Sequence, residues 1–396
     1  MYPPDIKSIN IYNSRCLIRV DYNVPFCNGE IINDFRIKES YDTIKYCLEN
    51  NCKIILMTHI GRPKGSFDKD LSVKNMINHL TDYFGTEVLY GGKEINFKSV
   101  ALSKEIKNKS ILILENLRFS NAEQENDSSY SELLSMHGDI FINDAFGTAH
   151  RAHASNVGVA GFFSDNKKAI GCLMSRELKY LSKSISNPHK PLTILLGGAK
   201  VTGKIELIEN MIKFADNILV GGAMAFTFLY SLGYEIGDSL LDEKQIENSK
   251  RLIELAKMNN VKLILPADIV VKESKELDFI KCVAINNFNN KNIGLDIGPE
   301  TVELFKTKII NSSTVLWNGP MGYIEDERFT KGTSDIAYIV KNITDKGKIT
   351  VIGGGDTVSA IDQIDPKMNF THKSTGGGSA LELLSGKSLP AIEALV

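Results

Sequence analysis

Arginines and histidines follow several short apolar runs in the first 155 residues. They lie in the segments RVDYN, THIGRPKG, ENLRF and NDAFGTAHRAHAS, with one more in NDFRI. The cationic set is Arg36, His59, Arg62, Arg118, His150, Arg151 and His153. A single surface arginine is usually an ion pair, but several guanidinium groups at strand ends match carboxylate and phosphate oxygens bidentately. We therefore predict a site for a small, multiply anionic molecule.

In the second half of the sequence, the segments that follow the apolar runs are rich in glycine. They are GGAKVTGK, GGAMAF, WNGPMGYIE, GGGDT and STGGGSALELL. Such loops let backbone N–H groups approach phosphates, and a helix N-terminus adds a favourable dipole. We predict a nucleotide site here. Lys200, which follows two glycines at a strand end, is predicted to act in it.

Three of these features have simpler explanations. GGAKVTGK has the spacing of a P-loop, but Ile205 stands where Ser or Thr would hold Mg²⁺. HRAH lacks a third ligand at suitable spacing, so we predict no metal there. Arg19 lies inside an apolar run, where pairing with a carboxylate is the predicted role.

Ten short apolar runs alternate with amphipathic stretches. The runs are CLIRV, KIILM, EVLY, ILIL, DIFI, LTILL, NILV, KLIL, TVLW and KITVI. This alternation is typical of buried parallel strands in βαβ units. Ten strands exceed one comfortable sheet, so we predict an α/β fold of two Rossmann-like lobes, each a parallel sheet with helices on both faces. Open parallel sheets bind ligands beyond the carboxyl ends of their strands, so an anion lobe and a nucleotide lobe are expected to face each other, as in a small-molecule kinase.

A connecting helix is predicted over residues 171–187. Leu173, Leu178 and Leu181 recur at helical spacing, and the helix must stop before Pro188 because the residue before proline disfavours the helical conformation. Further along, the asparagine-rich stretch 286–292 is predicted to be an exposed loop.

The composition restricts the partners. The 396 residues carry 46 Lys and Arg against 48 Asp and Glu, for a net charge of −2. A chain so close to neutral has no global electrostatic attraction to nucleic acid or to anionic membranes, so neither is expected as a partner. Any anion site must be a local cluster.

A cytoplasmic location is expected. MYPPDIKSIN has two prolines and two charges where a secretory signal needs an apolar core, and the longest apolar runs are too short to cross a membrane. Six cysteines, at 16, 27, 47, 52, 172 and 282, form neither CxxC nor a zinc-like cluster. We predict free, buried thiols in a reducing compartment.

Ten ordered blocks resemble those of the phosphoglycerate kinases. They are RVDYNVP, THIGRPKG, LENLRF, DAFGTAHRAHAS, LLGGAKVTGKI, GGAMAFTFL, DIGPET, LWNGPMG, IGGGDT and STGGGSALELLSGKSLPAIEAL, and they span residue 19 to the last residue. The resemblance implies reversible phosphoryl transfer between 1,3-bisphosphoglycerate with MgADP and 3-phosphoglycerate with MgATP in glycolysis.

The resemblance also implies site residues. The implied phosphoglycerate-binding set is Asp21, Tyr22, Asn23, Arg36, His59, Ile60, Gly61, Arg62, Arg118 and Arg151. The implied nucleotide-binding set is Lys204, Gly294, Glu325, Gly354, Gly355, Asp356 and Thr357, with Asp356 placing Mg²⁺ through the nucleotide. Arg36, Lys200, Gly355 and Gly377 resemble the groups that steady the phosphoryl group during transfer.

The expected domains are 1–170 for phosphoglycerate, 171–187 as an interdomain hinge helix, and 188–384 for the nucleotide. Residues 385–396 are expected to pack back onto the first domain, as in the family. Both substrates must come together with water excluded, so hinge closure is expected. A monomer is also expected.

Three positions depart from the family pattern. Ala223 stands where a third glycine is common, and its methyl is expected to tighten the adenine slot and raise the nucleotide KM. Gly203 replaces a polar residue before Lys204 and is expected to loosen that loop, while Ile60 for Leu conserves volume.

Two other functions are weighed against a kinase. A non-catalytic nucleotide-binding protein is disfavoured because Arg36, Lys200 and Asp356 are all present. A P-loop or dinucleotide-dependent enzyme is disfavoured because Ile205 follows Lys204 and no GxGxxG turn follows the first strand.

Overall fold

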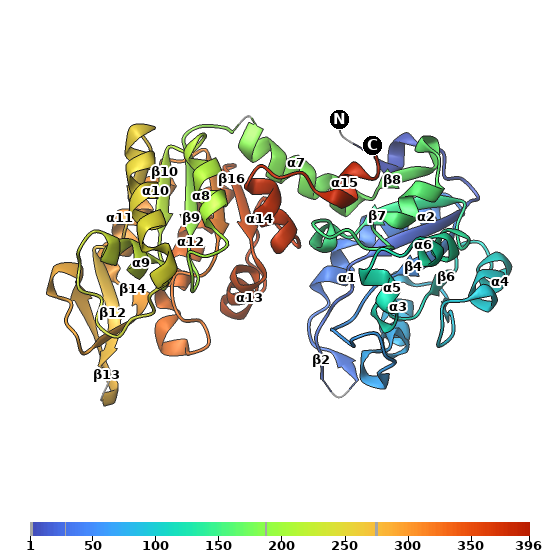
Figure 1. The fold of residues 1–396 in the computed structure, drawn as a ribbon, viewed down its shortest axis with the longest axis horizontal. Coiled ribbons are helices and arrows are strands. Elements are labelled where there is room, and N and C mark those ends of the chain that lie inside the picture. The colour runs from blue at the N-terminus through green and yellow to red at the C-terminus, as the bar shows by residue number, and fades with distance from the viewer. Residues whose placement is uncertain (1–2, 28, 187, 274–275) are drawn as a thin grey trace. The chain divides into compact units, whose positions relative to one another are not determined.

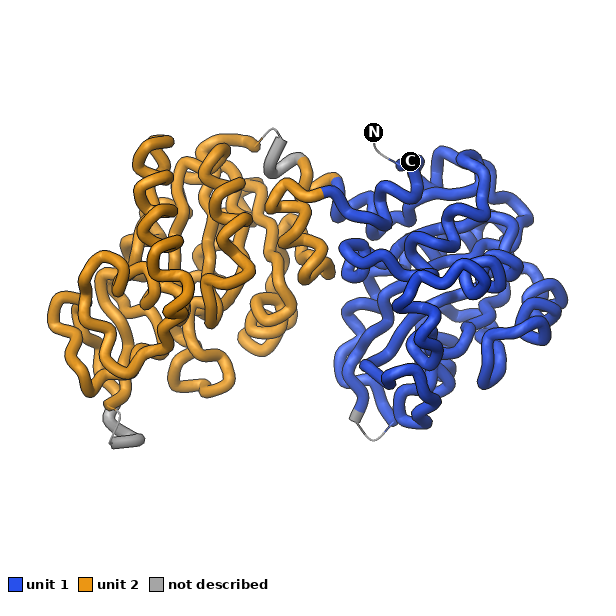
Figure 2. The backbone as a smooth tube through the Cα atoms, viewed as in Figure 1, with its two compact units in different colours: residues 1–178, 388–396 blue, residues 179–387 orange. Residues whose placement is uncertain are grey.

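The computed structural model describes residues 3–27, 29–186, 188–273 and 276–396. The chain divides into two compact units, which Figure 2 colours separately. Unit 1 comprises residues 1–178 and 388–396, and unit 2 comprises residues 179–387. Each unit contains a six-stranded parallel sheet with its own helices (Figure 1), so the predicted two-lobe α/β fold is confirmed.

The sheet of unit 1 has the strand order β5-β6-β4-β1-β7-β8, with every pairing parallel. Its strands are β1 (Arg15–Val20), β4 (Lys53–Met57), β5 (Val88–Tyr90), β6 (Ile111–Ile113), β7 (Ile140–Asp144) and β8 (Lys168–Ile170). Runs rich in Ile, Leu and Val form these strands because both faces of the sheet are buried. The edge strand β8 was not predicted, since three residues of KAI give no periodic signal.

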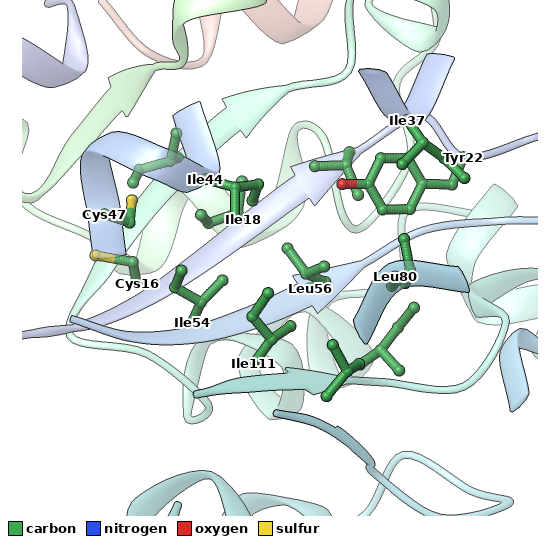
Figure 3. Packing of buried hydrophobic residues seen from close by; sticks show 14 of the residues in the cluster. Cys16, Ile18, Tyr22, Ile37, Ile44, Cys47, Ile54, Leu56, Leu80 and Ile111 are labelled. Carbon is green, nitrogen blue, oxygen red and sulfur yellow. The ribbon is translucent and has the colours of Figure 1, made fainter. Parts of the chain in front are cut away.

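Helices cover this sheet and bury its apolar side chains. They are α1 (Phe35–Glu39), α2 (Tyr41–Glu49), α3 (Ile77–Phe84), α4 (Phe97–Glu105), α5 (Asn121–Gln124), α6 (Ser128–Ser135) and α15 (Pro390–Glu393), and a hairpin pairs β2 (Phe26–Cys27) with β3 (Glu30–Ile31). Figure 3 shows part of the core, where Ile18, Leu56 and Ile111 of the sheet pack with Ile44 of α2 and Leu80 of α3.

The sheet of unit 2 has the strand order β11-β10-β9-β15-β16-β17. Its strands are β9 (Leu192–Leu196), β10 (Asn217–Val220), β11 (Lys262–Ile264), β15 (Thr314–Asn318), β16 (Ile349–Gly353) and β17 (His372–Lys373). The helices of the unit are α8 (Ile205–Ile212), α9 (Met224–Ser231), α10 (Ile246–Met258), α11 (Pro299–Ile310), α12 (Lys331–Asp345), α13 (Gly355–Ile364) and α14 (Gly378–Leu384). The two-residue edge strand β17 was not predicted.

A second sheet in unit 2 was also missed. It is antiparallel, in the order β13-β12-β14, and is built from β12 (Asp268–Glu273), β13 (Glu276–Ala284) and β14 (Asn292–Ile297). The prediction of an exposed loop over 286–292 is partly wrong, because Phe288 packs into the core beneath this sheet and the buried Asn292 begins β14.

The cysteines whose side chains are described carry free thiols. Cys16, Cys47 and Cys52 are buried, as predicted, but Cys282 is exposed and Cys172 is half-buried. Cys282 lies on β13, where its thiol donates to Asp268 Oδ2 over 3.2 Å. The prediction of burial fails there because it assumed a parallel-sheet core rather than a small surface sheet.

Helix α7 (Cys172–Ser186) matches the predicted connecting helix over the described residues, and residue 187 lies outside them. The division between the units falls within it, between Leu178 and Lys179. Asp144, at the end of β7, caps its first turn, because Met174 N–H donates to Asp144 Oδ1 over 3.0 Å. Asp144 is fully buried, and its Oδ2 has no hydrogen-bond partner in the described structure.

The last residues of the chain belong to unit 1. Ala391 N–H donates to the Ala149 carbonyl over 3.1 Å, and the Lys168 ammonium donates to the Ala394 carbonyl over 3.1 Å. The first contact ties α15 to the segment after β7, and the second ties the end of the chain to the edge strand β8. None of the helices in the described part of the chain is long and apolar enough to span a membrane.

Candidate active site

The basic cluster of unit 1 lies where three neighbouring strands end. Asp21 follows β1, His59 follows β4 and Arg118 follows β6. Because parallel strands end at the same edge of a sheet, residues far apart in the sequence meet there. The structure thus brings together the segments that the cationic pattern singled out.

Asp21 holds Arg36 at this edge through an ion pair between Oδ2 and Nη1. Burial opposes ionisation of Asp21, but the nearby guanidinium groups of Arg36 and Arg19 outweigh it and lower the pKa of the carboxyl. Asp21 is therefore a charged anchor rather than a proton donor. Two-thirds of the Arg36 side chain is covered, so its guanidinium is oriented while part of it stays accessible.

His59 contacts a buried arginine. Arg19 Nη2 lies 3.0 Å from His59 Nδ1, Arg19 Nε donates to Ser155 Oγ over 2.9 Å, and Arg19 Nη1 donates to the Val20 carbonyl. Ser155 in turn donates to Glu123 over 2.6 Å. The prediction that Arg19 pairs directly with a carboxylate is wrong, because the Ser155 hydroxyl stands between Arg19 and Glu123.

Arg118 is held against the loop that follows β4. Its Nη1 donates to the Gly61 carbonyl over 2.7 Å, while Gly61 N–H donates to Asn23 Oδ1 over 2.9 Å. Burial, together with the neighbouring Arg151 and Arg19, lowers the pKa of Arg118 to about 10, so Arg118 stays charged at neutral pH. Asn23 and Gly61 thus fix the position of a permanent cation.

The cationic set also contains His150 and His153. Burial, reinforced by Arg19, Arg118 and Arg151, lowers the pKa of His153 to about 4. Arg151 Nε lies 3.2 Å from His150 Nε2. His153 therefore adds no positive charge to the cluster at neutral pH.

Three of the predicted residues take different places. Arg62 is exposed, and within the described residues it makes no hydrogen bond or ion pair. Tyr22 and Ile60 instead point into the core. The Tyr22 hydroxyl lies 2.7 Å from Ser40 Oγ, and the backbone of Ile60 is bound on both sides by Asn116. Tyr22 and Ile60 therefore shape the site through the backbone rather than through their side chains.

Closely packed loops after β9, β10 and β15 form the corresponding edge of unit 2. Gly198 N–H donates to the Pro320 carbonyl over 2.9 Å, and Gly222 N–H donates to the Met321 carbonyl over 3.0 Å. A Cβ on Gly222, whose φ is +62°, would meet Gly198 N at 2.5 Å. Only glycine permits this approach.

Lys204 lies beneath these loops. Its ammonium donates to the Gly197 carbonyl. Burial lowers the pKa of Lys204 to about 8, against the attraction of the Asp356 carboxylate. Thr357 ties the start of α13 to the same loops, because Gly319 N–H donates to its Oγ1 over 2.7 Å. Lys204 and Thr357 thus link the loops after β9, β15 and β16.

An open cavity of about 420 Å³ lies beside these loops and contains the predicted Gly294, Glu325 and Asp356. Its apolar wall comes from Phe226, Leu240, Ile269, Ile293, Leu295, Met321 and Tyr323. Ala223 lines it as well, at the start of α9, where its methyl takes up room that glycine would leave. The size and the apolar lining suit a nucleoside.

The other predicted groups of unit 2 lie in loops and at helix starts. Lys200 is exposed and, within the described residues, has no hydrogen bond or ion pair. Gly355 and Asp356 occupy the first turn of α13, and Gly377, with φ of +48°, precedes α14. Helix starts carry unpaired N–H groups that favour anions.

Sequence reasoning missed most of the cavity wall. Phe226, Ile269 and Ile293 carry no chemical group that a motif search would notice, and the last two lie on the unpredicted antiparallel sheet. Asp296 was missed too. It accepts from Gly332 N–H over 2.6 Å and from Ile297 N–H over 2.9 Å, and burial raises its pKa to about 7. The alternation of apolar residues in NIGLDI was the available signal.

The described residues contain no group of three His, Cys, Asp or Glu side chains arranged to hold a metal ion by themselves. Asp356 does present an exposed carboxylate to the cavity. A single hard oxygen ligand of this kind suits Mg²⁺ that arrives bound to phosphates.

Proteins similar to this chain share its full length. A phosphoglycerate kinase of Finegoldia magna is 44% identical over 393 residues, covering 98% of each chain. One from Thermosipho africanus is 44% identical over 397 residues, covering 98% of this chain and 97% of its own.

Solved structures are similar over the same extent. The phosphoglycerate kinase of Coxiella burnetii superposes with a TM-score of 0.87 at 34% identity, covering 99% of this chain and 98% of its own. The phosphoglycerate kinase of Pyrococcus horikoshii OT3 superposes with a TM-score of 0.82 at 29% identity. The sequence profile of the family described as "Phosphoglycerate kinase" matches residues 6–387. With a basic strand edge in one unit and a glycine-lined strand edge in the other, the chain belongs to the phosphoglycerate kinase family, whose members are phosphotransferases of glycolysis.

Proposed function

We propose that the chain transfers a phosphoryl group reversibly between 1,3-bisphosphoglycerate with MgADP and 3-phosphoglycerate with MgATP. The main support for this proposal is that the strand ends of the two units carry different kinds of groups. The strand ends of unit 1 gather fixed cations, and those of unit 2 provide close glycine backbone beside a nucleoside-sized cavity. The first suits an acceptor with several negative charges, and the second suits a nucleotide.

The acceptor is bound in unit 1. Arg36, Arg62, Arg118 and Arg151 supply charge, and His59 and Asn23 supply neutral polar groups, while Asp21 orients Arg36. Tyr22, Ile60 and Gly61 set the backbone around them. The acceptor carboxylate is already a nucleophile, so no general base is needed.

The nucleotide is bound in unit 2. The nucleoside lies in the cavity that Gly294 and Glu325 line, and the phosphates lie toward Lys204 and the Gly354–Thr357 turn. Asp356 would hold Mg²⁺ that arrives bound to the phosphates, and the ion would offset their negative charge.

The transfer step depends on positioning and on cations placed where the transferred oxygens carry charge. Arg36 and Lys200, with backbone N–H groups near Gly355 and Gly377, are assigned to this step. Bending about residues 171–187 brings the two bound substrates in line and excludes water. We further propose a monomer that acts in the cytoplasm.

A coupled spectrophotometric assay with 3-phosphoglycerate and MgATP tests the proposal. Turnover that needs both substrates and a divalent cation supports it. No turnover by folded protein, shown to be folded by circular dichroism and by binding of ADP, rejects it. Binding of NAD(P) in place of ADP rejects it as well.

Arg62→Ala is expected to weaken binding of 3-phosphoglycerate by about 10–100-fold, because a charge-assisted hydrogen bond contributes about 1.5–3 kcal/mol. Arg62 has no partner to disturb in the described structure, so thermal stability and ADP binding stay as they are. Calorimetric titration with each ligand measures this. The exposed Lys98→Ala is the control. Equal affinity in the two variants removes Arg62 from the acceptor site.

Gly294→Ala is expected to raise the KM for ADP about tenfold and to destabilise unit 2. Its Cβ would lie 2.0 Å from Phe226 Cζ, and Phe226 is itself buried and packed beside Phe288, so the ring must shift against the cavity. Gly161→Ala is the matched control, since a Cβ there has open space around it. An unchanged KM for ADP places the base elsewhere.

A further inference from the structure

Arg19 is a buried cation that the roles assigned above leave unused. It lies on β1 with 1% of its surface exposed, yet within the described residues it is not paired directly with a carboxylate. Its guanidinium contacts the Ser155 hydroxyl, the Val20 carbonyl and Nδ1 of His59. Burying a guanidinium is costly, so these contacts must hold it in one place.

The contact with His59 has only one consistent arrangement of hydrogens. A guanidinium has donors and no acceptor, and it stays protonated in proteins. Arg19 Nη2 lies 3.0 Å from His59 Nδ1, so Nδ1 must present its lone pair. The hydrogen of a neutral imidazole then sits on the other nitrogen, Nε2.

We propose that Arg19 is a positioning residue whose buried guanidinium fixes His59 as the neutral tautomer with its hydrogen on Nε2. His59 then serves the acceptor site as an uncharged hydrogen-bond donor. Protonation of His59 would set two N–H donors and two positive charges against each other across this contact.

The charges around His59 agree with this arrangement. His59 is 3% exposed, and burial lowers the pKa of its imidazole well below its usual range. Arg19 of β1, Arg118 after β6 and Arg36 of α1 lower it further, while Asp21 after β1 opposes them. Among the described residues, these three cations outnumber Asp21 as charged groups near the ring.

Ser155 and Glu123 fix the Arg19 side chain in turn. Ser155 Oγ accepts from Arg19 Nε and donates to Glu123 Oε1, and Ser155 N–H donates to Glu123 Oε2 over 3.0 Å. Glu123 is 1% exposed, so this chain of contacts runs through the interior of unit 1. The orientation of His59 is therefore set by residues that need not touch the substrate.

The inference rests on the proposed function only where it assigns His59 to the acceptor. Protein carrying ¹⁵N-labelled histidine gives the tautomer of each ring from two-bond ¹H–¹⁵N correlations, with no substrate present. The missing signal in His59→Gln assigns His59. We expect the Nε2–H pattern without titration from pH 5.5 to 8. A hydrogen on Nδ1, or protonation of His59 within this range, overturns the proposal.

Arg19→Lys keeps the charge but cannot reach three partners at once. We expect His59 in this variant to show mixed tautomers or to titrate. The KM for 3-phosphoglycerate should rise about tenfold, as for one lost hydrogen bond, with kcat within about twofold and a new inflection in the pH profile of kcat/KM. Arg15→Lys is the matched control, because Arg15 lies at the other end of β1 and pairs with Asp139.

The outcomes distinguish a wrong role for Arg19 from a wrong proposed function. His59 signals and a pH profile that stay unchanged in Arg19→Lys reject the role of Arg19. The expected tautomer in a protein without phosphoglycerate turnover rejects the proposed function alone. If Arg19→Lys does not fold, the spectrum of the wild-type protein still decides whether His59 carries its hydrogen on Nε2.

Discussion

Lys200→Ala is expected to lower kcat by about 10²–10³ while the KM values for both substrates change less than tenfold. Removing one preorganised charge from a transition state costs about 3–4 kcal/mol of activation free energy. Lys200 is exposed after the Gly197–Gly198 turn and, in the described structure, has no partner, so its removal leaves no buried group unsatisfied. The loss should therefore appear in the rate rather than in stability.

Steady-state kinetics in both directions measure this effect. Lys250→Ala, at an exposed position of α10, is the control for loss of a surface lysine. Calorimetry shows whether ADP binds the variant as before. A kcat equal to that of the wild type would remove Lys200 from the transfer step.

Asp144→Asn is expected to raise the free energy of unfolding at pH 8 by about 2–4 kcal/mol. Burial raises the pKa of Asp144 to about 7, whereas an unfolded aspartate titrates near 4. Hydrogen bonds from Thr43 and from Met174 N–H, with the charge of Arg176, favour the carboxylate but do not outweigh burial. At pH 8 the folded protein must bury a charge at this position.

The sign of the pH dependence follows from the raised pKa. The stabilising contribution of protonated Asp144 is fully present below about pH 4 and is lost as the pH rises toward about 7. The wild type should therefore lose stability over this interval by up to about 1.4 kcal/mol for each pH unit from this group. Asp144→Asn should lose less.

Urea unfolding at pH 4, 6 and 8 tests this. The two proteins should be closest in stability at pH 4 and furthest apart at pH 8. Asp345→Asn, an exposed helix position paired with Lys341, is the control. A variant less stable than the wild type at pH 8 would show that the Asp144 carboxylate is needed as a charged cap for α7.

Much of each parallel sheet was predictable because neighbouring residues in the sequence indicate each of its longer strands. KIILM and LTILL became β4 and β9 with the predicted bounds, since a five-residue run that is mostly apolar suits a strand buried on both faces. The edge strands β8 and β17 were missed because they are two or three residues long and depend on a neighbour for pairing. The sheet of β12, β13 and β14 was missed because its strands lack the continuous runs of four or five residues by which the parallel strands were recognised.

The candidate site also contains residues that the sequence located correctly and residues that it did not. Arg36, His59 and Arg118 were identified from residue type and from their place after an apolar run, and the structure does gather them at one sheet edge. Tyr22 and Ile60 come from the same blocks, yet their side chains face the core. A motif gives the order of residues but not the side of the chain on which each one lies.

Residue types and their local order were enough to identify two parallel-sheet units, their contrasting strand ends and the family. Contacts between distant segments, by contrast, had to be seen in three dimensions. The link from Glu123 through Ser155 and Arg19 to His59, and the cavity wall built from β12, β14 and α9, join residues that are far apart along the chain. Burial and hydrogen-bond geometry at such contacts arise only when the elements pack, so no local pattern in the sequence encodes them.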